Sequence, residues 1–163
     1  MIRPARTSDV PAIKALVEPL VGNRVLMAKE TVAYYEGLQE FRIVEEDGEV
    51  LGCGALHVMW EDLAEIRTLA TRFDARGRGI GGALVAKLLQ DATRLGVDRV
   101  FCLTFEVPFF QRHGFEVMAD QSVVNPEVYS QLLRSHDEGV AEFLDLARVK
   151  PNTLGNTRMI RRL

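Results

Sequence analysis

The sequence predicts one mixed α/β domain over residues 1–163, in which an antiparallel meander precedes a central strand, loop and helix crossover. Two observations support this fold class. Asp47-Gly48 lies between two apolar runs, a pattern typical of a tight β-hairpin. Further on, an extended apolar run ends in a glycine-rich loop, Arg76 to Gly82, that leads directly into a helical pattern. Such a helix is the usual link between parallel strands.

The composition is that of an ordinary soluble protein. Of the 163 residues, 47% are apolar and 26% are charged, which suits a single packed domain. The net charge of −3 gives no indication of nucleic-acid binding. The start lacks the apolar core of a secretion signal, and no apolar run approaches the roughly 18 residues of a membrane span. We therefore expect a cytosolic protein that binds neither nucleic acid nor membrane.

The first part of the chain is expected to form strands and two helices. A short strand over 2–6 precedes Thr7-Ser8-Asp9, which offers a helix N-cap. Pro19 and Gly22 are expected to end this first helix. The other elements expected here are a helix over 29–38 and strands over 41–45, 49–59 and 63–71.

The second part is organised around a long helix. Apolar residues at i, i+3 and i+4 spacing between Ile80 and Leu95 predict it, and Gly96 is a natural C-cap. The elements expected after it are a strand over 100–104, a short helix over 108–113 ended by Gly114, a strand over 116–118, a helix over 126–134 and a strand over 157–163. Residues 139–149 remain unassigned.

The glycine loop is predicted to hold a phosphate or pyrophosphate. The first turn of a helix leaves backbone N–H groups without partners, and the macrodipole places about half a positive charge there. The glycines remove side chains that would keep an anion away, and the two arginines add positive charge. The residues of this predicted cradle are Arg76, Gly77, Arg78, Gly79, Ile80, Gly81 and Gly82.

Two common phosphate-binding motifs fit poorly. No Lys-Ser or Lys-Thr follows the last glycine, so the Walker A pattern fails. Gly77, Gly79 and Gly82 formally match G-x-G-x-x-G, but this match lies in the middle of the chain. Cys102 also stands near the place where a dinucleotide fold has its acidic residue.

The loop resembles the acetyl-CoA signature R/Q-x-x-G-x-G/A of the GNAT superfamily of N-acetyltransferases. Four other segments resemble the superfamily in the same order: the opening I-R-P-A-R-T-S-D-V, Leu51 to Gly54, Ala64 to Ile66, and Arg112 to Phe115. The resemblance implies the GNAT fold and acetyl-CoA as co-substrate. It also implies that the donor's pantetheine lies beside the central strand, against the backbone of Leu69, Ala70 and Thr71. One of these amides, taken as that of Leu69, would donate to the oxyanion.

Glu65 is the candidate general base. Because a strand alternates faces, Glu65, Arg67 and Leu69 are expected to point one way. A glutamate here resembles the histone-acetylating branch of the superfamily, in which it takes the proton from the amine. Burial would raise its pKa toward neutrality, as a general base requires. The alternative is that Glu65 only orients Arg67 or a backbone amide.

The general acid is not assigned. Phe110 stands where many relatives have the tyrosine that protonates the coenzyme thiolate. His57 and His113 are expected to be structural or solvated. The remaining candidates are Tyr129, Thr104, Ser130 and an ordered water, and the thiolate could also leave as the anion.

A narrower resemblance suggests the acceptor. Val50 to His57 and Trp60 to Arg67 resemble the acetyltransferase domain of N-acetylglutamate synthases, which begin arginine biosynthesis. Val149 to Met159 resembles the tail of their short, single-domain actinobacterial form. The resemblance implies acetyl transfer from acetyl-CoA to L-glutamate by direct attack, without a covalent intermediate or a metal. A homodimer is left open.

Glutamate carries two carboxylates, so basic and amide groups are the candidates to bind it. Lys29 stands where the family often has arginine, which keeps the charge but loses the forked contact. Arg158 could instead belong to a solvated edge strand, and the asparagines could be turn residues. The candidates are Lys29, Arg67, Lys150, Asn152, Asn156 and Arg158.

Two rival functions remain open. The first is the same chemistry on another amine, such as glutamine, another small amino acid or a protein N-terminus. The second is a non-catalytic acyl-CoA sensor, which Phe110 favours and Glu65 opposes. Cys53 and Cys102 lie in apolar strand-like runs and are expected to be packed thiols, so a ping-pong route through Cys102 is disfavoured.

Overall fold

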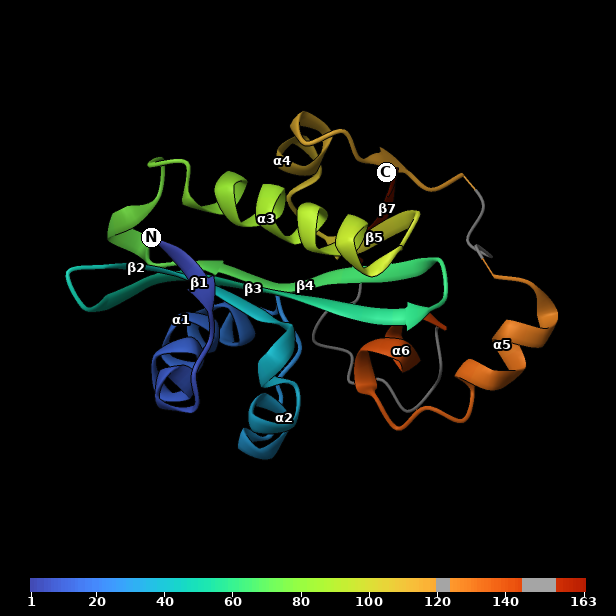
Figure 1. Ribbon diagram of the computed structural model, residues 1–163, viewed down its shortest axis with the longest axis horizontal. Helices are drawn as coiled ribbons and strands as arrows, with labels where there is room; N and C mark the ends of the chain where they lie inside the picture. The colour runs from blue at the N-terminus through green and yellow to red at the C-terminus, as the bar shows by residue number, and fades with distance from the viewer. Residues whose placement is uncertain (120–123, 145–154) are drawn as a thin grey trace.

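The computed structural model describes residues 1–119, 124–144 and 155–163. In these residues the strands form one seven-stranded sheet in the order β1-β2-β3-β4-β5-β7-β6, with helices on both faces (Figure 1). The strands are β1 (Ile2–Pro4), β2 (Phe41–Glu46), β3 (Glu49–Trp60), β4 (Leu63–Thr71), β5 (Arg99–Thr104), β6 (Glu116–Val117) and β7 (Thr157–Arg162).

The helices divide into two layers. In Figure 1, α3 and α4 cover one face of the sheet, and α1, α2 and α6 lie on the other, with α5 at one end. The helices are α1 (Val10–Gly22), α2 (Thr31–Glu36), α3 (Ile80–Leu95), α4 (Val107–Arg112), α5 (Pro126–Leu132) and α6 (Glu138–Phe143), with 3-10 turns η1 (Thr7–Asp9), η2 (Leu38–Glu40) and η3 (Phe73–Ala75). None of the described helices is long and apolar enough to cross a membrane.

The predicted hairpin is confirmed. β2 and β3 pair antiparallel, and the turn between them has positive φ at both central residues, 51° at Asp47 and 81° at Gly48. This conformation matches the twist of the flanking strands, and an Asp-Gly pair adopts it readily. A local sequence signal therefore sets this part of the meander.

Two glycines of β3 allow α3 to pack closely on the sheet. A Cβ atom at Gly52 would lie 2.8 Å from the Ile80 side chain, and one at Gly54 would lie 3.1 Å from Leu88. Such contacts would push the helix away from the sheet, because packed interiors leave no room for an added atom. Gly96 ends α3 in the predicted left-handed conformation, with φ of 82°.

The first helix confirms its prediction in part, because it ends at Gly22. Pro19 was expected to help end it, but α1 continues through Pro19 to Gly22. A proline removes only its own amide bond, and the turn after Pro19 is closed by the Asn23 amide, 3.1 Å from the Pro19 carbonyl. Asp9 lies at the N-cap position but accepts from the Arg6 amide at 2.6 Å, so its carboxylate does not cap α1.

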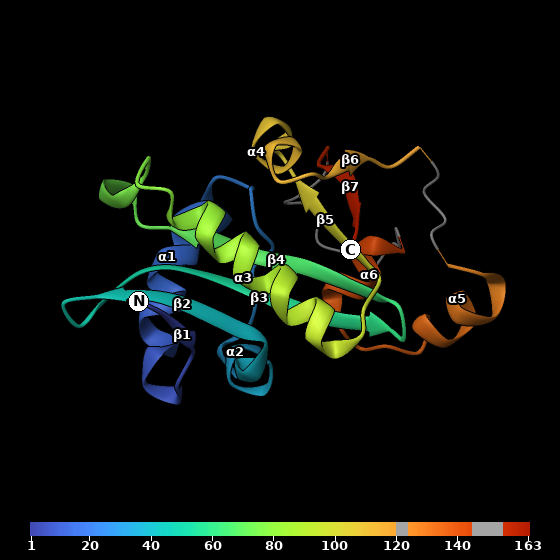
Figure 2. The ribbon, with the colours of Figure 1, turned by 45° about the horizontal axis from the view of Figure 1, so that its top comes forward.

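β4 and β5 start side by side and then separate. Their parallel pairing joins residues 63–65 to residues 99–101, and Figure 2 shows the two strands diverging beyond it. β5 instead pairs with β7 along its whole length. Within the described residues, the second half of β4 therefore has a strand partner on its β3 side only.

A bulge in β4 corrects the predicted side-chain alternation. Arg67 pairs with Ala55 but Ala70 pairs with Cys53, so β4 uses one extra residue, and Thr68 adopts a left-handed φ of 55°. Leu69 consequently packs in the core beneath α3, whereas Glu65 and Arg67 line a pocket on the opposite face. The prediction that Leu69 shares their face is wrong, because the bulge shifts the alternation by one residue.

Candidate active site

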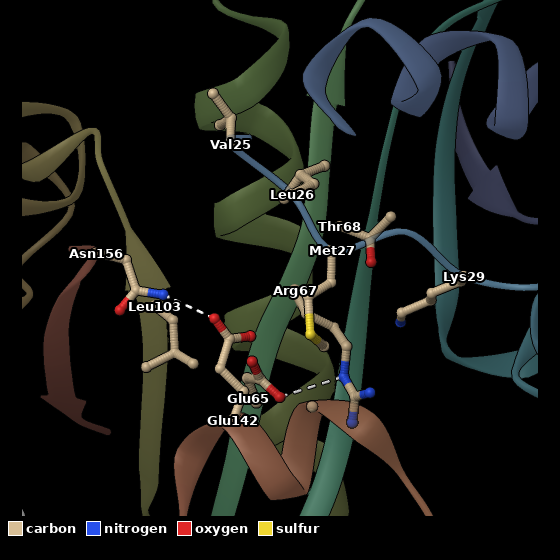
Figure 3. Close-up of a pocket in the computed structure, with 11 residues that line it drawn as sticks. Val25, Leu26, Met27, Lys29, Glu65, Arg67, Thr68, Leu103, Glu142 and Asn156 are labelled. Atoms are coloured by element: carbon tan, nitrogen blue, oxygen red, sulfur yellow. Dashed lines mark hydrogen bonds and ion pairs between the residues drawn. The ribbon is translucent and has the colours of Figure 1, made fainter. Parts of the chain in front are cut away.

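A pocket opens beside the bulge, on the face of the sheet that carries α6 (Figure 3). Its wall combines side chains of β4 with the segment between α1 and α2, residues of β5 and α6, and the residue before β7. The lining residues are Val25, Leu26, Met27, Lys29, Glu65, Arg67, Thr68, Leu103, Gly139, Glu142 and Asn156.

Glu65 is the buried carboxylate of this pocket, with only 4% of its surface exposed. Burial raises the pKa of Glu65 above its usual range, and the positive charges of Arg67, His57 and Lys29 oppose the rise. Its Oε2 lies 3.3 Å from Nε of Arg67 and has no hydrogen-bond partner in the described part of the chain. A buried carboxylate with a raised pKa has the chemistry of a proton acceptor near neutral pH.

Arg67 is buried between two acids. Its Nη1 donates to both carboxylate oxygens of Asp137, each at 3.0 Å. Nη2 is buried and makes no hydrogen bond to any described residue. A buried, unpaired donor costs about 1–3 kcal/mol, so this nitrogen is suited to a ligand oxygen.

Lys29 adds a second positive charge to the same part of the pocket. Figure 3 shows its amine extending toward the side of the pocket that holds Arg67. Burial, and then the charge of Arg67, lower the pKa of Lys29. The predicted cationic pair of Lys29 and Arg67 is therefore brought together, although the two residues are far apart in the sequence.

The other predicted substrate contacts have mixed outcomes. Asn156 lines the pocket and donates through Nδ2 to Oε1 of Glu142 at 2.8 Å. Arg158 is not among the lining residues, and its guanidinium lies over the Phe143 ring, 5.8 Å from the centroid. Lys150 and Asn152 lie outside the described residues.

The glycine loop lies at the other end of β4 and leads into α3. Gly77 and Gly79 have φ of 79° and 80°, and a Cβ atom at either would meet nothing within 4 Å. Their conformation, not crowding, therefore requires glycine. In the described part of the chain no side chain caps the start of α3, so its first amides have no side-chain partner there.

The remaining loop residues have specific neighbours. Gly82 makes room for His113, whose ring would lie 3.0 Å from an added Cβ atom. Arg78 forms an exposed ion pair with Glu46 at 2.7 Å, and Arg76 stacks over Phe73 at 5.1 Å. The positive charges predicted for the cradle are thus partly engaged with protein groups.

Leu69, Ala70 and Thr71 connect the loop to the pocket. They lie on the part of β4 that has left β5, so their outer backbone edge has no strand partner in the described residues. From Thr71 back to Glu65 the strand spans roughly 20 Å. An extended ligand arm could therefore run along this edge from the loop to the buried carboxylate.

The hydroxyl candidates for the general acid lie in different places. Thr104 is buried at the end of β5 that diverges from β4, and its Oγ1 accepts from the Glu106 amide at 2.8 Å. Tyr129 and Ser130 belong to α5, at the far end of the molecule from the glycine loop in Figures 1 and 2. Phe110 is buried against Phe115 in an edge-to-face contact.

Sequence reasoning missed several acidic residues of the site. Asp137 is the N-cap of α6 and Glu142 lies within this helix, which the sequence pattern did not predict. Glu40 Oε1 lies 2.6 Å from Nδ1 of His57, and His57 is the direct partner of Glu65 on the neighbouring strand. The signal for Asp137 was its position directly before a helix start, which also marks many purely structural caps.

Neither cysteine is suited to covalent catalysis. Cys53 and Cys102 are buried free thiols, as predicted. Burial raises the pKa of Cys53 to about 12 and raises that of Cys102 as well. Because the thiolate is the nucleophile, both side chains are unreactive packing groups. Within the described ranges, no cluster of three or more His, Cys, Asp or Glu side chains could hold a metal ion.

Comparison with known proteins gives concordant matches. Residues 23–115 match the acetyltransferase (GNAT) family. An amino-acid acetyltransferase of Mycobacterium tuberculosis is 53% identical over 98% of this chain and 92% of its own length.

Two solved structures extend the likeness to the fold. Rv2747 from Mycobacterium tuberculosis, in complex with CoA and NLQ, has a TM-score of 0.94 and 52% identity, covering 100% of this chain and 99% of that one. N-acetylglutamate synthase from Neisseria gonorrhoeae, complexed with coenzyme A and N-acetyl-glutamate, has a TM-score of 0.82 and 27% identity. The match covers 100% of this chain and 35% of that one.

Proposed function

This chain belongs to the acetyltransferase (GNAT) family, and on that premise we propose that it transfers the acetyl group of acetyl-CoA to the α-amino group of L-glutamate. One observation carries the choice of acceptor. The pocket beside β4 places a buried carboxylate, Glu65, next to two cationic side chains, Arg67 and Lys29. An amino acid with an amine to deprotonate and carboxylates to bind fits this arrangement.

Acetyl-CoA fits the other end of the site. The glycine loop and the start of α3 offer backbone amides to its diphosphate, with Gly77 and Gly79 holding the loop in its left-handed conformation. The pantetheine arm follows the edge of β4 past Thr71, Ala70 and Leu69, which has no strand partner among the described residues. The relatives from Mycobacterium tuberculosis and Neisseria gonorrhoeae were both crystallised with coenzyme A, which supports this assignment.

Glu65 acts as the general base. The amine of an amino acid is protonated at neutral pH, so one proton must leave before nitrogen can attack the thioester carbon. A carboxylate whose pKa is raised by burial accepts that proton more readily than an exposed one. The neutral amine attacks and the C–N bond forms. As the C–S bond then breaks, nitrogen loses a second proton, which passes to solvent or through a neighbouring group to the departing thiolate; the thiolate otherwise leaves as the anion.

The oxyanion is assigned to the backbone amide of Leu69. The bulge at Thr68 interrupts regular pairing at this point, and a fixed amide donor is effective because it needs no reorganisation during the reaction. The buried thiol of Cys102, with its raised pKa, supports direct attack rather than an acetyl-enzyme.

Arg67 and Lys29 bind the carboxylates of glutamate. Nη2 of Arg67 is a buried donor without a hydrogen-bond partner among the described residues, and the Lys29 amine extends toward Arg67. Asn156 contributes an amide at the opposite wall. A ligand with two carboxylates would satisfy both cations at once.

Glutamine is a second candidate acceptor, and Glu142 favours it. The Glu142 carboxylate lines the pocket beside Asn156, where it would accept a hydrogen bond from a carboxamide and repel a second carboxylate. Glu142→Gln should therefore shift the ratio of kcat/KM toward glutamate. If this ratio stays constant in the variant, Glu142 does not select the acceptor.

The test is turnover across an amino-acid panel, measured by release of the coenzyme thiol. We expect glutamate or glutamine to exceed other amino acids by about tenfold or more in kcat/KM. Intersecting initial-rate lines indicate direct transfer, whereas parallel lines with an acetylated Cys102 would contradict it. Calorimetric binding of acetyl-CoA with no turnover of any amine would favour a sensor instead.

A further inference from the structure

The Asp137 carboxylate contacts both the first turn of α6 and the Arg67 guanidinium. Oδ1 of Asp137 accepts from the Val140 amide at 2.9 Å, which makes it the N-cap of the helix. The same carboxylate receives Nη1 of Arg67 through both of its oxygens. Asp137 therefore joins the backbone of α6 to the guanidinium at the floor of the pocket.

Gly139 allows this close approach. A Cβ atom at Gly139 would lie 2.9 Å from Nη1 of Arg67 and 3.0 Å from Oδ1 of Asp137. Gly139 is not among the residues with positive φ, so lack of space is the reason for glycine here. Any side chain would separate α6 from the guanidinium or displace it.

We infer that Asp137 and Gly139 are positioning residues, which seat the Arg67 guanidinium so that its Nη2 faces the amino-acid pocket. The inference rests on the proposed function, because it assigns Nη2 to an acceptor carboxylate. With Nη1 engaged by Asp137, Nη2 is a buried nitrogen without a hydrogen-bond partner in the described residues. A guanidinium is planar, so fixing one nitrogen sets the direction of the others.

The ionised state of Asp137 agrees with this role. Burial alone would raise the pKa of Asp137, but the charge and hydrogen bonds of Arg67 and the Val140 amide outweigh it and hold the pKa at about 2. The carboxylate is thus charged across the working range of pH. If Asp137 served only as a helix cap, its charge would be dispensable.

The experiment compares Asp137→Asn and Gly139→Ala with Asp62→Asn. Asparagine keeps the N-cap oxygen but removes the charge that holds Arg67. We expect the KM for glutamate to rise about tenfold in Asp137→Asn and further in Gly139→Ala, with the KM for acetyl-CoA unchanged within about twofold. Asp62→Asn removes an Arg–Asp contact of 2.7 Å outside the pocket and should change neither KM.

A double-mutant cycle separates positioning from a structural role. If Asp137 acts through Arg67, Asp137→Asn should cause no further loss in an Arg67→Gln background. Additive losses, or an unchanged KM for glutamate in a folded Asp137→Asn protein, would overturn the inference. If Gly139→Ala does not fold, as circular dichroism would show, the cycle alone decides.

Failure of the proposed function would look different. Calorimetric titration with glutamate in the presence of coenzyme A measures the affinity of the same variants for glutamate without turnover. A wild-type protein that neither binds nor acetylates glutamate or glutamine would contradict the function and the inference together. If the wild-type protein binds and acetylates glutamate or glutamine, but the losses of Asp137→Asn and Arg67→Gln are additive, only the inference is contradicted.

Discussion

The two ends of β4 offer different kinds of recognition. At the Thr71 end, the predicted coenzyme site consists of backbone. It combines glycines with left-handed φ, the first amides of α3 and a strand edge, and neither the amides nor the edge has a partner of that kind in the described ranges. At the Glu65 end, the proposed amino-acid pocket combines charged and apolar side chains from several elements. The bulge at Thr68 separates the two regions and turns Leu69 to the face opposite Glu65 and Arg67.

This difference indicates how each region can change. A backbone site requires conformation, so glycine replacements are harmful there while most neighbouring side chains are free to vary. A side-chain pocket requires charge and position, so conservative replacements of single residues alter affinity for one substrate only. The five predictions that follow test this contrast, in order of decreasing effect.

Gly81→Asp tests the coenzyme end and has the largest expected effect. It places a carboxylate in the first turn of α3, so affinity for acetyl-CoA should fall more than about 100-fold through charge repulsion and crowding near Phe109. Calorimetric titration with acetyl-CoA measures the loss. Gly22→Asp is the control, because Gly22 is exposed and has no neighbour within 4 Å. Equal affinities in wild type and Gly81→Asp would remove the loop from the site.

Glu65→Gln tests the base at the pocket end. We expect kcat to fall about 100-fold near neutral pH. Because burial raises the pKa of Glu65, the wild-type rate should decline as pH falls through that raised pKa. In the variant the loss should shrink at high pH, where the amine deprotonates unaided. Glu49→Gln, an exposed residue paired with Arg72, is the control. A wild-type pH–rate profile in Glu65→Gln would exclude this role.

Asp137→Asn should also lower stability, by about 2 kcal/mol at pH 7. The pKa of Asp137 is depressed to about 2 in the folded protein from an ordinary 3.8. Its stabilising contribution is therefore complete above about pH 4 and is lost as the pH falls toward 2. Urea unfolding of both proteins at pH 7, 4 and 2.5 measures the difference. If the difference in unfolding free energy between the two proteins stays constant over this pH range, the pKa of Asp137 is not depressed.

Lys29→Met tests the second cation of the pocket. Methionine keeps an apolar stem of similar length, so the variant isolates the charge. The KM for the amino acid should rise about tenfold while the KM for acetyl-CoA remains unchanged. Lys14→Met, which loses a surface contact to Thr31, is the matched control. A rise in the KM for acetyl-CoA alone would mean that Lys29 belongs to the coenzyme end.

Thr104→Val has the smallest expected effect and concerns the leaving thiolate. Thr104 ends β5, beyond the residues that pair with β4, and its hydroxyl can donate a proton while its oxygen accepts from the Glu106 amide. Because a thiolate can leave as the anion, kcat should fall only about threefold. Tyr129→Phe, on distant α5, should leave kcat unchanged. The reverse pattern would assign the acid to Tyr129.

Local signals explain what could be predicted. The Asp47-Gly48 hairpin, the α3 helix and its Gly96 cap each depend on residues close together in the chain, and the structure confirms them. The expected strand over 63–71 has the bounds of β4. The acetyl-CoA signature is contiguous, so the predicted coenzyme residues could be named directly, and they stay predictions as binding residues.

Long-range packing explains what could not be predicted. The bulge at Thr68 has no sequence signal, because it arises from the register between β3 and β4 and overrides the alternation expected for Leu69. The contact of Asp137 with Arg67 joins residues 70 positions apart. Nothing in either local sequence indicates the other.

The sequence by itself determined the order of elements, the turns and the glycine loop, because these depend on backbone conformation and hydrophobic period over a few residues. Only the tertiary structure decided which charges share a pocket. The sheet and its helices bring separate segments together. This arrangement buries Glu65, places Arg67 against the start of α6 and brings Lys29 into the same pocket. The electrostatic interactions between these groups depend on that spatial arrangement.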